Sequence, residues 1–314
     1  MVLREVRRGQ RGLVLAIRSA RASAASFALG LLLALSGAAS AEVSVRVRVA
    51  DRVDSVPLEL YVERTVASEI YPSWPLEVLK AQAVVARTYA LHERARNADL
   101  HYDVESSVVS QRYREGAVPA RIRAAVAQTR AEFLEYGDGP ILAAFHASSG
   151  GRTASSEEVW GQPLPYLIGV SSPDDGSPDY FWSFEIARED LVDALRARGF
   201  AVGEGRDVAV TESSPSGRVQ RLRVGDAEVT GREIRRALGG RALRSTKFEL
   251  RVSDEGTVRF LGSGSGHGVG LCQWGARALA DSGKSYREIL AHYYPGSRLR
   301  TGRSAQALGA GVGR

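Results

Sequence analysis

Length, composition and charge exclude several classes of protein. The chain has 314 residues, and its 44% hydrophobic content is normal for a globular protein and too high for a mainly disordered one. The net charge of +6 would favour a nucleic-acid partner, but residues 1–41 hold six of the arginines and one acid. Removing them from the 42 basic and 36 acidic residues leaves 36 and 35, so we expect no nucleic-acid partner.

The first 41 residues have the layout of a cleaved secretory signal. An arginine-rich start precedes an apolar run over about residues 27–35, and Ala-Ser-Ala at residues 39–41 resembles a cleavage site. We expect cleavage before Glu42 and export to the periplasm, the cell envelope or the extracellular space. The apolar run is short for a bilayer span, and an uncleaved membrane anchor is the alternative.

Beyond Glu42, hydrophobic periodicity and helix punctuation predict mixed helices and strands. Alternating valines indicate a strand, and prolines at the first turn begin three helices. The predicted elements are a strand over 43–53, helices over 57–71, 75–96 and 119–129, and a hairpin of 133–136 with 141–145.

The helix over residues 57–71 places an acid on its apolar face. With about 100° of rotation per residue, Glu69 lies within about 20° of Leu58. Glu59 and Glu63 lie roughly 80° and 120° from Glu69, toward the edge of the apolar stripe, where solvated charges are usual. Burial raises the pKa of a carboxyl, which suits a general acid. A glutamate paired with a buried arginine for structure alone is the alternative.

The second half of the chain contains a smaller α+β unit. A helix near 190–198, strands near 208–212 and 219–224, a helix capped by Thr230 with Glu233, and a last strand over 248–252 are predicted there. Helices over 271–280 and 286–294 follow. We divide the chain into a signal peptide (1–41), a core in two parts (42–187 and 254–300), an inserted α+β subdomain (188–253) and a tail expected to be disordered (301–314).

A glycine-rich segment over residues 262–270 does not fit a nucleotide-binding loop. Its glycines all fall at even-numbered positions, whereas the G-x-G-x-x-G fingerprint needs glycines at both even and odd positions. Gly283-Lys284-Ser285 lacks the earlier glycine of a phosphate loop, because that position is Ala278. Nucleotide binding is therefore excluded, and we expect no cofactor.

Four blocks of sequence resemble the SpoIID/LytB family, named for stage II sporulation protein D. They are Val66-Ala67-Ser68-Glu69, residues 79–90 (LKAQAVVARTYA), His146-Ala147-Ser148-Ser149-Gly150-Gly151 with Glu158-Val159-Trp160-Gly161, and residues 266–276 (GHGVGLCQWGA). The blocks occur in the family's order and span about residues 56–298. The resemblance is looser over about 190–250.

The resemblance implies an α+β fold around a glycan-binding cleft and a lytic transglycosylase that acts on peptidoglycan, often on strands without stem peptides. In the family, the glutamate at the position of Glu69 is the catalytic acid. Lys80 and Arg87, which are seven residues apart on one helix face, occupy positions thought to matter for activity. A cation against Glu69 would lower its pKa, so we expect them to bind substrate or brace the cleft; a surface stripe is the alternative.

Further cleft residues follow from the two glycine-rich blocks. As candidate substrate-binding residues we name His146, Ser148, Ser149, His267 and Gln273. A nucleophilic Ser-His arrangement is disfavoured, because no nucleophile elbow occurs. Trp160 and Trp274 could stack on sugar rings or pack in the core.

Some relatives bind zinc through a histidine and cysteines in the segment that matches 101–113. Here the cysteine positions are Glu105 and Ser110, and the second histidine position is Val109. His101 and Glu105 alone would make a poor zinc site, so we expect no structural metal.

The predicted signal and the family resemblance together imply an exported enzyme that cleaves the bond between N-acetylmuramic acid and N-acetylglucosamine. A hydrolase would need a second carboxylate near Glu69, and the family-like blocks supply no obvious one, so we expect 1,6-anhydromuramoyl ends rather than hydrolysis. If hydrolysis did occur, Glu158 would be the first candidate for that second carboxylate. A non-catalytic glycan-binding protein that modulates a cell-wall amidase is the alternative. The expected partners are glycan strands and, among proteins, a cell-wall amidase.

Overall fold

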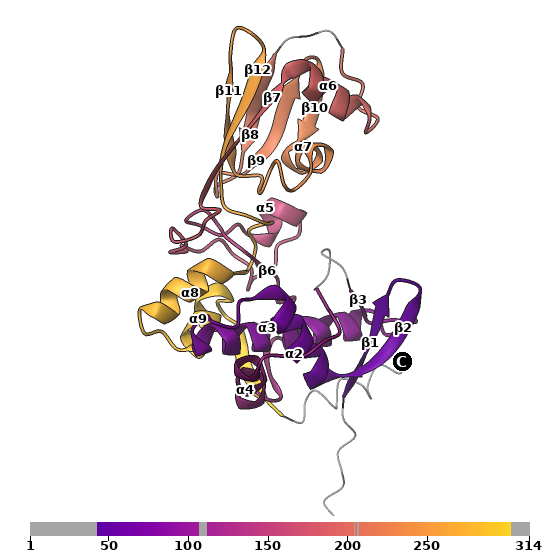
Figure 1. Ribbon diagram of the computed structural model, residues 1–314, viewed down its shortest axis with the longest axis vertical. Coiled ribbons are helices and arrows are strands. Elements are labelled where there is room, and N and C mark those ends of the chain that lie inside the picture. Colours follow the sequence, from indigo (N-terminus) through magenta and orange to yellow (C-terminus); the bar gives the residue numbers. More distant parts are fainter. Residues whose placement is uncertain (1–42, 107–111, 204, 206, 303–314) are drawn as a thin grey trace, which may run out of the picture. The chain divides into compact units, whose positions relative to one another are not determined.

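The N-terminal end of the described chain is a β-hairpin. The computed structural model describes residues 43–106, 112–203, 205 and 207–302 (Figure 1). Strand β1 (Ser44–Val49) pairs antiparallel with β2 (Arg52–Pro57), and β3 (Val104–Glu105) joins the other edge of β1 in parallel. The chain reverses at Ala50, whose φ is 52°. The prediction of one strand over 43–53 was therefore wrong in length.

A group of helices surrounds the first hydrophobic core. Helices α2 (Leu58–Glu69), α3 (Leu76–Arg96) and α4 (Ala120–Gln128) each follow an N-cap proline, which confirms the three predicted helices. From the C-terminal part of the chain, α8 (Gln273–Asp281) and α9 (Tyr286–Tyr293) pack against α3 (Figure 1). The two ends of the described chain thus build one core.

Two small sheets join distant segments in this core. Strand β4 (Glu132–Tyr136) lies between β5 (Gly139–Pro140) and β14 (Arg298–Thr301). The predicted first strand of the hairpin is confirmed, but its partner is Gly139–Pro140 and not residues 141–145, so the second strand was predicted wrongly. Thr301, where the predicted tail begins, ends β14, and residues 303–314 lie outside the described residues. Strand β6 (Phe145–His146) pairs in parallel with β13 (Leu271–Cys272) and joins two of the family-like blocks.

A second hydrophobic core draws its buried residues from Trp182 to Phe260, a range that contains the predicted subdomain 188–253. Thr230 caps α7 through a reciprocal capping box with Glu233, as predicted. The elements around this core are β7 (Phe181–Ala187), α6 (Arg188–Arg196), β8 (Val208–Ser213), β9 (Val219–Val224), β10 (Ala227–Thr230), α7 (Gly231–Leu238), β11 (Phe248–Val252) and β12 (Thr257–Ser263). Strand β12 lies between β11 and β7, and β9 lies between β10 and β8.

The observed fold is mixed α+β, as the sequence predicts. None of the helices in the described residues combines the length and apolar character needed to cross a bilayer. The predicted signal peptide lies outside the described residues.

Candidate active site

A cleft of about 640 Å³ lies at the C-terminal end of α2. It receives residues from the end of α2, from the loop after β6, from the segment before β7 and from the start of α8. Among the sequence-predicted site residues, its lining contains Glu69, His146, His267 and Gln273. The structure thus brings together residues from three of the four family-like blocks.

Glu69 is the last residue of α2 and continues its buried stripe. Leu58, Val62 and Val66 are buried on that stripe, and Glu69 follows at helical spacing, half-buried at the cleft. The backbone N–H of Arg112 donates to Oε1 of Glu69 at 2.7 Å. Burial raises the pKa of the Glu69 carboxyl, against the lowering effect of this hydrogen bond and of nearby arginine charges. The carboxyl is therefore tuned toward the protonated form that a general acid needs.

The loop after β6 is anchored by a carboxylate that the sequence analysis missed. Asp174 Oδ2 accepts hydrogen bonds from Ser148 Oγ at 2.6 Å and from the backbone N–H groups of Ser149 and Gly150 at 2.5 and 2.9 Å. Its Oδ1 accepts from the N–H of Gly151 at 2.8 Å. Ser148 and Ser149 are fully buried and are not part of the cleft lining, so they lie behind the cleft wall.

The glycine-rich segment interlocks with this loop. Ser265 forms a β-bridge with Ser148, and Val269 forms one with Ala154. Gly268 has φ of +86°, and a Cβ there would lie 2.0 Å from Nη2 of the buried Arg218. The even spacing of the glycines therefore serves close packing of two loops.

Both cleft histidines are held neutral. Burial, with the charge of Arg218 among the further causes, lowers the pKa of His146 well below its usual value and that of His267 to about 4. His146 Nδ1 donates to the carbonyl of Val269 at 3.1 Å, and its Nε2 is hydrogen-bonded to Ser149 Oγ at 2.8 Å. Because Ser149 is buried outside the cleft lining, this pair offers no accessible nucleophile.

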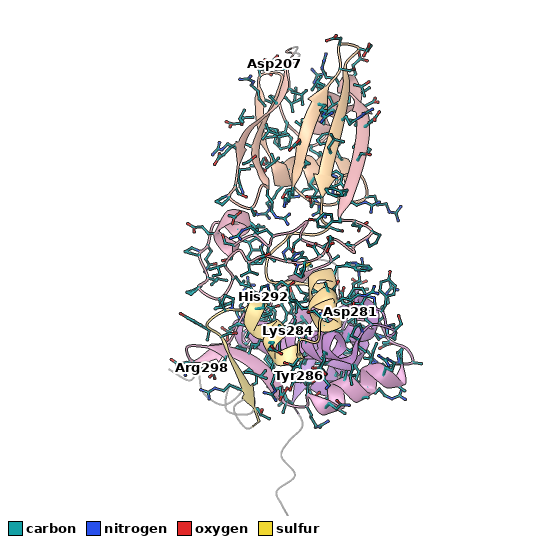
Figure 2. The ribbon with its side chains drawn as sticks, turned by 90° about the vertical axis from the view of Figure 1, so that its left-hand side faces the viewer. Asp207, Asp281, Lys284, Tyr286, His292 and Arg298 are labelled. Atoms are coloured by element: carbon teal, nitrogen blue, oxygen red, sulfur yellow. The ribbon has the colours of Figure 1, made fainter. Side chains whose placement is uncertain are left out.

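Lys80 and Arg87 do not belong to the lining of the cleft. Lys80 forms a salt bridge with Glu77 at 2.8 Å, and its Nζ lies 5.6 Å from the ring centroid of Tyr286, which Figure 2 labels. Arg87 is fully buried and forms a two-pronged salt bridge with Glu59, with distances of 3.0 and 2.6 Å. The structural alternative considered for Glu69, a glutamate paired with a buried arginine, is therefore found at Glu59, whose partner is Arg87.

Aromatic side chains flank the cleft. Trp274 and Trp74 both line it and meet edge to face, with ring centroids 4.9 Å apart. Trp160 ends α5 (Ser156–Trp160) and is 37% exposed, with its ring 5.6 Å from that of His267. Trp274 therefore combines core packing with a place in the cleft wall.

Asp179 is a second carboxylate of the lining that the sequence analysis missed. It forms a salt bridge with Arg244. Glu158, the sequence-based suspect, lies outside the lining. Burial acts to raise its pKa, but hydrogen bonds from the hydroxyls of Ser214 and Ser216 and from the N–H groups of Ser155 and Ser216 lower it. Glu69 and Asp179 are the carboxylates that the described residues bring to this cleft.

The described part of the chain holds no group of three His, Cys, Asp or Glu side chains placed to bind a metal ion. Val109 and Ser110, on which the metal expectation partly rests, lie outside the described residues.

Two family models match the chain over separate ranges. A family model described as stage II sporulation protein matches residues 48–136, and one described as a domain of unknown function (DUF8618) matches residues 155–270. The first match covers Glu69, and the second covers His267 and the second core.

Three relatives illustrate the similarity. Stage II sporulation protein D of Bacillus amyloliquefaciens is 35% identical over 261 residues, which cover 78% of this chain and 74% of that protein. Stage II sporulation protein D of Bacillus subtilis is 32% identical over 267 residues, covering 79% and 75%. The amidase enhancer of Bacillus subtilis is 27% identical over 286 residues, covering 74% of this chain and 39% of that protein.

Proposed function

The chain belongs to the stage II sporulation protein D family, and we propose that it is a peptidoglycan lytic transglycosylase whose acid is Glu69. Membership of this family ties the chain to the bacterial cell wall. The observation that carries the proposal is a half-buried carboxyl with a raised pKa, which lines a cleft together with tryptophan rings. This combination suits a carbohydrate substrate that must be protonated.

Glu69 would act twice in the reaction. Its proton goes to the oxygen that leaves the anomeric carbon of the muramoyl sugar, and the glycosidic bond breaks. The resulting carboxylate then takes the proton of the muramoyl 6-hydroxyl as that oxygen attacks the same carbon. The 6-hydroxyl belongs to the same sugar, which gives the advantage of an intramolecular reaction and yields a 1,6-anhydromuramoyl end.

The surroundings of the second lining carboxylate favour this course over hydrolysis. A hydrolase needs a second carboxylate, either to activate water or to act as nucleophile. Asp179 is engaged with Arg244, so its charge is already compensated. We expect Asp179→Asn to retain most of the cleavage and to leave the anhydro product unchanged. Reducing ends in the mass spectra of wild-type digests, lost in Asp179→Asn, would show that Asp179 completes a hydrolase.

Replacement of Glu69 by glutamine tests the central claim. The amide side chain of Glu69→Gln would keep an oxygen that can accept the Arg112 N–H, so the thermal midpoint should stay within a few degrees of wild type. Cleavage of purified glycan should fall by about 10²-fold or more, the usual contribution of a general acid. Glu63→Gln is the matched control, because Glu63 lies on the same helix outside the cleft lining. Cleavage retained by Glu69→Gln would refute the assignment.

A second candidate function rests on the relative named amidase enhancer. In that case the protein would bind glycan and modulate a cell-wall amidase without cleaving the strand itself. Turnover of glycan strands by the purified protein alone separates the two functions. Stimulation of an amidase with no cleavage would favour the second.

A further inference from the structure

A pocket rich in arginine adjoins the cleft. It has a volume of about 400 Å³ and lies where α7 meets the end of α5. Arg232, Arg235 and Arg236 contribute the charged side chains of its lining, and no carboxylate is among the described residues that line it. Trp160, which is partly exposed, provides an aromatic wall. A positively charged pocket with an aromatic face suits an anionic sugar.

Backbone carbonyls hold two of these arginines in place. Arg232 Nη1 donates to the carbonyl of Val159 at 3.1 Å. Arg235 donates from Nε to Leu243 O at 2.8 Å and from Nη2 to Arg244 O at 3.0 Å. Carbonyl groups orient a guanidinium without neutralising its charge. The guanidinium groups of Arg232 and Arg235 are therefore oriented before a ligand binds, and their carbonyl partners do not neutralise their charge.

No acid within the described chain pairs with the three arginines. None of them forms a salt bridge there. Glu233 shares α7 with them, and its Oε2 accepts from Thr230 N at 2.7 Å and Thr230 Oγ1 at 2.8 Å. These hydrogen bonds, with the charges of Arg236 and Arg232 as smaller causes, lower the pKa of Glu233, so this acid offsets part of the positive charge without forming a salt bridge. The buried Arg218 adds a further positive charge close enough to lower the pKa of His267. The lining of the pocket therefore carries positive charge and no carboxylate of its own, which suits an anionic ligand.

The pocket and the cleft share a wall. Gly266 and His267 line both hollows. The ring of His267 lies between those of His146 on the cleft side and Trp160 on the pocket side, with centroid distances of 5.5 and 5.6 Å. The cleft and the pocket are therefore neighbouring hollows on either side of His267.

We propose that the arginine pocket binds a carboxylate of the same glycan strand that occupies the cleft, and so sets the register of the strand against Glu69. This inference rests on the proposed function, because it takes the occupant of the cleft to be peptidoglycan. The carboxylate has two sources in that polymer. It is the free lactyl group of a muramoyl sugar without peptide, or a carboxylate of the stem peptide where the lactyl group is amidated by the peptide.

Binding to the Glu69→Gln protein, in which the glycan is not consumed, tests the proposal. The probes are a peptide-free tetrasaccharide with free lactyl carboxylates, the same tetrasaccharide with those groups converted to methyl amides, and the strand with intact stem peptides. Affinities are measured by calorimetry at low salt, because partly exposed charges are screened at high salt. We expect at least one carboxylate-bearing probe to bind about tenfold more tightly than the amide, and which of them does so identifies the source.

Removal of the charge should abolish this preference. The double variant Arg232→Gln and Arg236→Gln, added to Glu69→Gln, changes two side chains that are not buried and should bind the acid and amide probes within about twofold of each other. Arg236→Gln alone is the fallback if the double variant unfolds, because the exposed side chain of Arg236 makes no hydrogen bond to the described residues. Arg198→Gln with Arg251→Gln removes two exposed charges outside the pocket lining and should keep the preference.

Equal binding of all three probes, or a preference that survives in the pocket variants, would overturn the inference. Its failure is separable from failure of the proposed function. Cleavage by the wild-type protein without carboxylate preference refutes the pocket alone. Carboxylate preference without cleavage refutes the enzyme and leaves a glycan-binding site.

Discussion

Replacement of Arg87 by methionine asks whether this arginine holds the fold or binds substrate. Its side chain is 1% exposed, and its guanidinium donates to both carboxylate oxygens of Glu59 and to the carbonyl of Glu132 at 3.0 Å. In Arg87→Met, the Glu59 carboxylate, which is 16% exposed, would lose its counter-ion. Removing one partner of a buried pair costs about 3–5 kcal/mol. At about 2–4 °C per kcal/mol, the thermal midpoint should fall by roughly 6–20 °C.

The measurements are thermal unfolding and glycan cleavage per folded molecule, the latter well below the midpoint. Cleavage per folded molecule should be close to wild type, because Arg87 does not line the cleft. Lys80→Met is the control on the same helix. Its salt bridge with Glu77 is more exposed, with side chains 15% and 32% accessible, and should contribute about 1 kcal/mol or less.

A double variant distinguishes the cost of an unpaired Glu59 charge from the cost of losing the whole Arg87–Glu59 ion pair. Arg87→Met combined with Glu59→Leu removes both charges and should be less destabilised than Arg87→Met alone, because no buried charge is left unpaired. An Arg87→Met protein that unfolds like wild type and fails to bind glycan would refute this reasoning. It would restore Arg87 as a substrate-binding residue.

Four further predictions follow from the sequence and the structure. The exported protein should begin at Glu42 by amino-terminal sequencing and hold no stoichiometric zinc; one zinc per chain after dialysis would contradict this. The kcat/KM for glycan should fall as pH rises through the raised pKa of Glu69, because the acid loses its proton; a rise over that range would exclude an acid role. The free energy of unfolding should fall as pH drops from about 6.5 toward about 4, because the fold holds His267 neutral with a pKa of about 4, and His267→Gln should flatten this decline. Gly268→Ala should lower the thermal midpoint, because its Cβ would lie 2.0 Å from Arg218 Nη2, at a cost of about 1–3 kcal/mol; an unchanged midpoint would mean that Arg218 moves freely.

Local signals in the sequence predicted the helical part of the fold well. Pro57, Pro75 and Pro119 precede helices within a residue of the predicted starts, because a fixed φ at the first turn and a run of apolar spacing agree there. The same periodicity placed Glu69 on the buried stripe of α2. The strand at residue 43 was predicted too long, because the reversal at Ala50-Asp51 contains no glycine or proline, and Ala50 is not a residue type that favours its φ of 52°.

The contacts between loops could not be predicted in the same way. Asp174 accepts four hydrogen bonds from the Ser148–Gly151 loop, yet it stands in an ordinary turn-like run of sequence, and only tertiary folding brings it there. Arg218 lies beneath Gly268 for the same reason. Glu59 was taken as an edge charge because rotation around an isolated helix does not reveal that α3 brings Arg87 against it. The one available signal was the Ser148–Gly151 loop itself, because its buried backbone N–H groups need an acceptor such as a carboxylate.

Gln273 connects a helix end that local sequence predicts with a tertiary contact that it does not predict. A helix leaves its last carbonyls without intrahelical partners, and Glu69 ends α2. Gln273, at the first turn of α8, donates from Nε2 to the carbonyl of Glu69 at 3.2 Å and lies 3.4 Å from Oε1 of Gln82. It therefore satisfies the helix end that carries the proposed acid, and it does so from the block that also supplies His267. This contact favours a role for Gln273 in positioning Glu69, because a side-chain amide already bonded to the helix end has less freedom to follow a sugar.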